Sequence, residues 1–129
     1  MTPPRSLRVL LVEDDPIDAE LICSELQCSG LDLNIQRVGD RSAFLAGMSS
    51  GPDVIVTDLR LPQFSGLEAL ELAQQYGLAV PLILVSGLDE DEFPMHPTRA
   101  GVAGIISKSH LEELGPLVRR VLAHPESAG

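Results

Sequence analysis

The stretch DVIVTDLRLPQFSG, residues 53–66, changes character at its sixth residue. It begins with a β-branched apolar run, Val54 to Val56, which is typical of a buried strand. The run stops on the carboxylate of Asp58 and passes into a segment with Pro62 and Gly66, which indicates a loop. The stretch therefore predicts a buried strand that presents an acid at its carboxyl end, and the rest of the chain decides what that acid can do.

Strand and helix patterns alternate on both sides of this stretch. Strands that alternate with helices at short spacing imply a parallel sheet with helices on both faces. We therefore predict an α/β fold of the flavodoxin-like kind, a doubly wound five-stranded parallel sheet in the order 2-1-3-4-5 with five helices. The strands are expected at residues 7–12, 33–38, 53–57, 82–85 and 103–106, and the clearest helices at 17–28, 41–48, 67–76 and 110–122.

Caps and prolines set the expected helix boundaries. Asp15 and Asp40 are expected to cap the first two helices, because a short acidic side chain satisfies free N–H groups there. The fourth helix, at about residues 89–99, is expected to be short or broken, because prolines 94 and 97 fall inside it. Pro116 should bend the last helix or delay its start. The buried face of the first helix is expected to consist of Ile17, Leu21, Ile22 and Leu26.

Composition limits the classes of function. The 129 residues fit one domain, residues 1–129 with a core of about 7–122, and 44% hydrophobic residues suffice for a core. The net charge of −10 repels nucleic acids and anionic membranes, so neither is an expected partner. Cys23 and Cys28 do not predict a disulfide, and no stretch is long and apolar enough for a membrane span. We expect a cytoplasmic protein.

The predicted sheet gathers several charged groups at one edge. If neighbouring strands bring carboxylates to about 4 Å, each pair costs on the order of 4 kcal/mol at an effective dielectric of 20. A hard cation such as Mg²⁺ would relieve that cost, and an amine and a hydroxyl nearby could hold the oxygens of a phosphoryl group on Asp58. The groups are Glu13, Asp14 and Asp15 after the first strand, Asp58 after the third, Ser86 after the fourth and Lys108 after the fifth.

This succession of side chains resembles the receiver domain of bacterial response regulators, of the single-domain, chemotaxis-regulator-like kind. The resemblance rests on LLVEDDP (10–16), VTDLRLPQFSG (56–66), LVSG (84–87) and ISK (106–108). It implies that Asp58 accepts a phosphoryl group, that Ser86 contacts this group and that Lys108 pairs with it. It also implies a Mg²⁺ site formed by Asp14 and Asp58, by Glu13 through water and by the main-chain carbonyl of Arg60.

The resemblance implies a role in two-component signalling or a phosphorelay. A sensor histidine kinase or a histidine phosphotransfer protein would supply the phosphoryl group, and the domain would catalyse only its own phosphorylation and dephosphorylation. Output is then expected through protein–protein contact, with a homodimer among the options and the downstream partner open. The domain could stand alone or be excised from a longer protein.

Three departures from the family pattern keep alternatives open, and the first is the pair of prolines in the expected fourth helix. Ile105 occupies a position where the family usually has an aromatic switch residue, and Ser109 replaces the proline that usually follows the lysine. The Lys108–Ser109 bond is therefore either trans with a rearranged loop or cis with strain. One alternative is a receiver fold that acts as an adaptor or dimerisation module without phosphorylation. The other alternative is a phosphohydrolase of the haloacid dehalogenase type, a class that requires an aspartate at the position that Arg60 occupies here.

Overall fold

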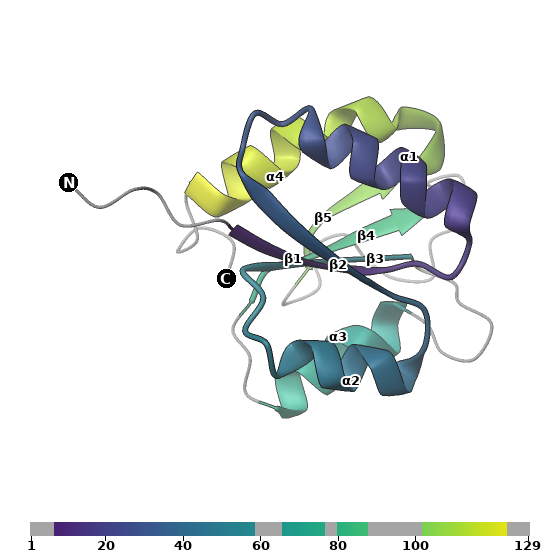
Figure 1. Ribbon diagram of the computed structural model, residues 1–129, viewed down its shortest axis with the longest axis vertical. Helices are drawn as coiled ribbons and strands as arrows, with labels where there is room; N and C mark the ends of the chain where they lie inside the picture. The colour runs from purple at the N-terminus through teal and green to yellow at the C-terminus, as the bar shows by residue number, and fades with distance from the viewer. Residues whose placement is uncertain (1–6, 59–65, 77–79, 88–101, 124–129) are drawn as a thin grey trace.

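Five parallel strands form one sheet in the order β2-β1-β3-β4-β5, which confirms the predicted fold (Figure 1). The computed structural model describes residues 7–58, 66–76, 80–87 and 102–123. The strands are β1 (Leu7–Val12), β2 (Leu33–Val38), β3 (Val54–Asp58), β4 (Leu82–Ser86) and β5 (Val102–Ser107). The helices are α1 (Pro16–Gln27), α2 (Arg41–Met48), α3 (Gly66–Gln75), the 3-10 helix η2 (Lys108–Glu113) and α4 (Leu114–Ala123). The predicted fourth helix lies outside the described residues.

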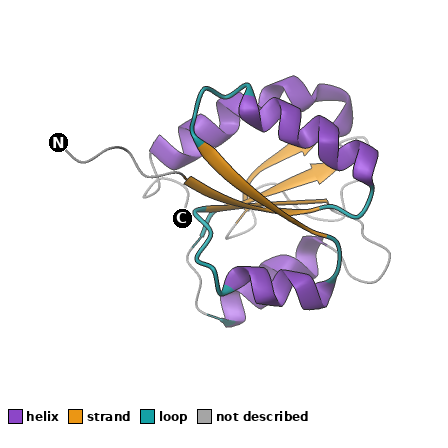
Figure 2. Cartoon of the chain, viewed as in Figure 1, coloured by secondary structure: helices purple, strands orange, loops and turns teal. Residues whose placement is uncertain are grey.

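The helices cover the sheet in two layers, α1 and α4 on one face and α2 and α3 on the other (Figures 1 and 2). Alternate residues of a strand point to opposite faces, so β1 supplies both layers of the core. Val9 and Leu11 pack toward α1 and α4, whereas Leu10 packs toward α2 and α3. Gly47 allows α2 to approach the sheet closely, because a Cβ atom there would lie 2.6 Å from Cδ1 of Leu10.

The start of α1 follows the predicted cap, but its predicted apolar face is partly wrong. The Asp15 side chain accepts a hydrogen bond from the Ile17 N–H at 3.0 Å, and Pro16 is the first helical residue. Ile17 and Leu21 are 69% and 51% exposed, because the helix buries Ala19, Ile22 and Leu26 instead. At about 100° per residue, Ile17 and Leu21 fall on the opposite side from that buried set.

The chain after β5 begins with a 3-10 turn. The described residues contain no cis peptide bond, so the Lys108–Ser109 bond is trans. The Ser109 N–H donates a hydrogen bond to Oγ of Ser107 at 3.1 Å, a bond that a proline could not make. Pro116 stands in the first turn of α4, where proline is tolerated, and the last α-helix accordingly starts only at Leu114. This confirms a delayed start.

Two further expectations concern the thiols and membrane spans. Cys23 and Cys28 are both free thiols. No helix within the described segments has the length and apolar character needed to cross a membrane.

Candidate functional site

The sheet register places the predicted acidic residues side by side. Val12 of β1 pairs with Thr57 of β3, so the residue that follows each partner, Glu13 or Asp58, emerges at the same edge. The carboxyl ends of parallel strands form the edge at which such folds bind ligands. On the next strand Asp58 pairs with Val85, and on the last one Ser86 pairs with Ser107.

Glu13, Asp14 and Asp58 form a carboxylate cluster, with one oxygen of each residue within 4.8 Å of the others. Glu13 is fully buried and Asp58 is only 7% exposed, whereas Asp14 faces solvent. One Glu13 oxygen, Oε1, accepts a hydrogen bond from the Asp15 N–H at 3.1 Å. The cluster therefore combines two nearly dry carboxylates with one that is in contact with water.

Lys108 brings a positive charge into this carboxylate cluster. Its Nζ donates hydrogen bonds to Oδ2 of Asp58 at 2.8 Å and to Oδ2 of Asp18 at 2.7 Å. The same nitrogen lies 3.4 Å from Oε2 of Glu13. One amine thus connects the ends of β1 and β3 with the first turn of α1.

Asp18 and Arg37 are site residues that the sequence analysis missed. Asp18 lies three residues after Asp15, the cap of α1, and this helix starts at the edge of the sheet that carries the site. This position in the first turn was the sequence feature that could have identified Asp18 as a site residue. Arg37 of β2 donates to the main-chain carbonyls of Glu13 at 3.0 Å and Asp14 at 2.9 Å. It therefore holds the backbone of the acidic pair, a role that strand alternation does not reveal.

Burial and mutual repulsion change the proton affinity of the cluster. Burial raises the pKa of Glu13 to about 7, and neighbouring Asp58 adds to the increase. Burial alone would lower the pKa of Lys108, but its hydrogen bonds to Asp18 and Asp58 outweigh this and raise that pKa above its usual value. Lys108 is consequently a permanent cation at physiological pH, while Glu13 exchanges protons near neutrality.

The donor set fits a hard divalent cation. Oε2 of Glu13 is buried and accepts no hydrogen bond from the described residues, and leaving such an oxygen without a donor is costly. Three carboxylates within 4.8 Å offer the oxygen ligands that Mg²⁺ prefers, and exposed Asp14 leaves room for the waters that this ion retains.

Two predicted site residues complete the comparison with the sequence. Ser86 is buried at the carboxyl end of β4, one residue beyond the Val85 that pairs with Asp58. Arg60 lies outside the described residues. The structure therefore brings together Glu13, Asp14, Asp58 and Lys108, and it places Ser86 on the neighbouring strand at the same edge.

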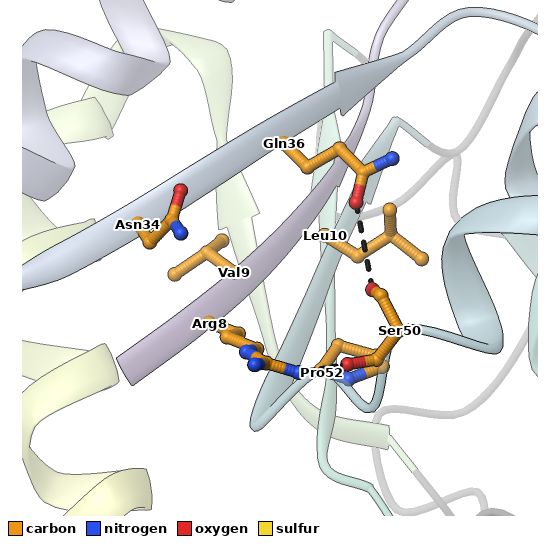
Figure 3. A pocket seen from close by; sticks show the side chains of 7 residues that line it. All are labelled: Arg8, Val9, Leu10, Asn34, Gln36, Ser50 and Pro52. Carbon is orange, nitrogen blue, oxygen red and sulfur yellow. Dashed lines mark hydrogen bonds between the residues drawn. The ribbon is translucent and has the colours of Figure 1, made fainter. Parts of the chain in front are cut away.

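A separate hollow of about 230 Å³ lies toward the amino-terminal ends of β1 and β2 (Figure 3). Asn34 and Gln36 of β2 line one side, and Ser50 and Pro52 line the other. Arg8 is the cationic residue that lines this hollow, and its guanidinium already donates a hydrogen bond to the main-chain carbonyl of Ser50. This hollow contains no carboxylate cluster or free cation among its lining residues, so the site of interest remains the opposite edge of the sheet.

Residues 9–119 match the family model of the response regulator receiver domain. The protein named "Probable transcriptional regulatory protein TcrX" of Mycobacterium tuberculosis is 33% identical over 116 residues, which cover 88% of this chain and 49% of TcrX. The cell cycle transcriptional regulator CtrA of Caulobacter vibrioides is 29% identical, over 94% of this chain and 54% of CtrA. This chain thus spans about half the length of these curated relatives.

Solved structures agree with this match. The signal receiver domain of the response regulator NarL from Mycobacterium tuberculosis superposes with a TM-score of 0.75 and 27% identity, over 93% of this chain and 98% of that domain. A CheY-like receiver domain protein from Methanospirillum hungatei shares the fold, with a TM-score of 0.79 and 23% identity over 97% of this chain and all of its own. This chain belongs to the response regulator receiver domain family, the phosphoacceptor modules of two-component signalling.

Proposed function

We propose that Asp58 is the phosphoacceptor of this receiver domain. The observation that carries the proposal is the 2.8 Å hydrogen bond between Lys108 and an Asp58 carboxylate that is 7% exposed and clustered with two other acids. A cation at this distance neutralises charge on a group attached to Asp58, and phosphoryl transfer depends mainly on such positioning and neutralisation.

The transfer forms one bond and breaks another. An Asp58 oxygen attacks the phosphorus of a phosphohistidine on a kinase or a histidine phosphotransfer protein, so a P–O bond forms as the P–N bond breaks. The imidazole keeps the electron pair of the broken bond, and the product is an aspartyl phosphate. Lys108 stays beside the transferred oxygens, and we assign Ser86 to hold one of them from the end of β4.

The residues proposed for Mg²⁺ are Asp14 and Asp58 as direct ligands and Glu13 through water. The Arg60 carbonyl completes the proposed set, although this residue lies outside the described part of the chain. When bound, the ion neutralises negative charge on the phosphoryl oxygens. Arg37 supports the same arrangement, because it holds the main chain of the acidic pair at two carbonyls.

Receiver domains interact with histidine kinases, and we propose such a kinase or a phosphotransfer protein as the donor. We further propose that the phosphorylated domain changes its contacts with a protein partner. TcrX and CtrA are named transcriptional regulators, so the absence of nucleic acid among the partners stays a prediction for this acidic domain alone.

Intact-protein mass spectrometry tests the proposal. The wild-type protein is incubated with acetyl phosphate and Mg²⁺ beside Asp58→Asn, with a metal-chelated sample as a further control. We expect the wild type to gain one phosphoryl group only with Mg²⁺, and Asp58→Asn to gain none. A wild type that stays unmodified, with this donor and with a panel of kinases, would favour the phosphorylation-independent adaptor instead.

A further inference from the structure

Among the described residues, Asp18 is the carboxylate that lies closest to the amine of Lys108, the amine that serves the phosphoacceptor. Its Oδ2 lies 2.7 Å from Lys108 Nζ, against 2.8 Å for Asp58 and 3.4 Å for Glu13. The Asp18 side chain is 31% exposed, in the first turn of α1, while its competitors are almost fully buried. Lys108 is therefore shared between the phosphoacceptor and a carboxylate at the rim of the site.

We propose that Asp18 is a positioning residue that restrains Lys108 and thereby slows phosphorylation of Asp58. This inference rests on the proposed phosphoacceptor function. An ammonium group has three N–H donors, and in this structure one of them is directed to Asp18 rather than to the oxygens on Asp58. A phosphoryl group that arrives at Asp58 must compete with Asp18 for the same amine.

Charge acts in the same direction as the hydrogen bond. Because both oxygens bind one nitrogen, at 2.7 and 2.8 Å, Asp18 adds a negative charge close to the position of the incoming phosphoryl group. Positive charges at the rim of a site attract an anionic phosphoryl donor, and negative charges such as that of Asp18 repel it. The repulsion should grow with the charge of the donor.

The fold keeps Asp18 in place. The Asp15 cap and Pro16 define the start of α1, which places Asp18 in the first turn. Helix α1 also packs against η2, the 3-10 helix that begins at Lys108. The Asp18–Lys108 contact therefore joins two helices that pack against each other, and this packing keeps the two side chains within reach.

The test compares Asp18→Asn with the wild type at saturating Mg²⁺, so that any change in metal affinity is excluded. The readout is the second-order rate constant for phosphorylation by acetyl phosphate, which carries two negative charges at neutral pH, and by phosphoramidate, which carries one. We expect Asp18→Asn to react about three- to tenfold faster with acetyl phosphate and to show a smaller gain with phosphoramidate. A purely structural role of Asp18 would not depend on donor charge.

Two matched variants serve as controls. Asp18→Glu restores the carboxylate and should return the rate to near the wild-type value. Glu20→Gln removes the same charge from an exposed position of the same helix and should leave the rate unchanged. A rate for Asp18→Asn that equals or falls below wild type, or an equal gain in Glu20→Gln, would overturn the proposal.

A second measurement does not require phosphorylation. The exchange of the Lys108 ammonium protons with water, followed by NMR, should become several-fold faster in Asp18→Asn, because a charge-assisted hydrogen bond to a carboxylate is replaced by a weaker one to an amide oxygen. Unchanged exchange would refute the restraint on Lys108. Faster exchange in Asp18→Asn, together with a wild type that never accepts a phosphoryl group, would refute the phosphoacceptor function while leaving the restraint intact.

Discussion

Replacing Asp58 with asparagine should stabilise the metal-free protein, because the carboxylate cluster is held together against its own repulsion. The Glu13 and Asp58 oxygens lie within 4.8 Å, so at an effective dielectric of 20 their repulsion is at least about 3.5 kcal/mol. Asp14 adds a smaller, solvent-screened contribution, and burying the Asp58 carboxylate costs several kcal/mol more.

The opposing contribution is the attraction to Lys108. At 2.8 Å and the same dielectric, this attraction amounts to about 6 kcal/mol. Part of it is recovered in the variant, because Lys108 can approach Oε2 of Glu13, which lies 3.4 Å away in the wild type, and because the amide oxygen of the variant still accepts a hydrogen bond. The balance favours Asp58→Asn by roughly 1–3 kcal/mol, because an amide is much cheaper to bury than a carboxylate.

The assay is urea unfolding at pH 8 with a chelator, where Glu13 is ionised in the folded protein. Asp58→Asn should have the higher free energy of unfolding, and Glu20→Gln should match the wild type. At pH 5.5 the gain should shrink, because Glu13 is then protonated. Adding 10 mM Mg²⁺ should also reduce it, since a site with a Kd of about 1 mM would stabilise the wild type by about 1.4 kcal/mol. If Asp58→Asn were less stable than wild type at pH 8 without metal, the attraction of Lys108 would dominate and the repulsion argument would be wrong.

Three further changes test other parts of the structure. Burial raises the pKa of Glu13 to about 7 in the folded protein from its ordinary value of 4.5, so the folded state holds an extra proton between these two pH values. The free energy of unfolding of the metal-free wild type should therefore fall by roughly 1–3 kcal/mol relative to Glu13→Gln between pH 4.5 and 7.5, measured by urea unfolding. Ser109→Pro removes the hydrogen bond to Ser107 and restricts Lys108 to extended conformations, so thermal unfolding should show a loss of about 1–3 kcal/mol. Phe44→Ala opens a cavity in a fully buried position and should cost about 3–5 kcal/mol by the same method, with little change in Mg²⁺ affinity.

Topology was predictable because it depends on patterns that repeat along the chain. The expected bounds of β1 and β2 agree with the structure to the residue, since each is a short apolar or alternating run closed by polar or turn residues. Once the strand order was known, the meeting of Glu13 and Asp58 followed, because neighbouring parallel strands end at the same edge.

Side-chain direction and reach were not predictable in the same way. Ile17 and Leu21 fit an apolar helical pattern, yet they face solvent, because a pattern of apolar residues does not say which side of the helix meets the sheet. The contacts of Asp18 and Arg37 span 90 and 24 residues of sequence to Lys108 and Glu13, and depend on how long side chains bend across neighbouring elements.

The charge balance at this edge of the sheet separates the role of a bound divalent cation from the role of the Lys108 amine. When Glu13 is ionised, four carboxylates and two cations leave two negative charges, which is the charge that one divalent cation would neutralise. Replacing the single negative charge of Asp58 by an aspartyl phosphate would then add charge again, and Lys108 is the cation that already touches the acceptor. Phosphorylation should therefore draw Lys108 away from Asp18 and loosen the contact between α1 and η2, which links the chemistry to a helix rather than to Ile105. The groups in this balance are Glu13, Asp14, Asp18 and Asp58 against Lys108 and Arg37.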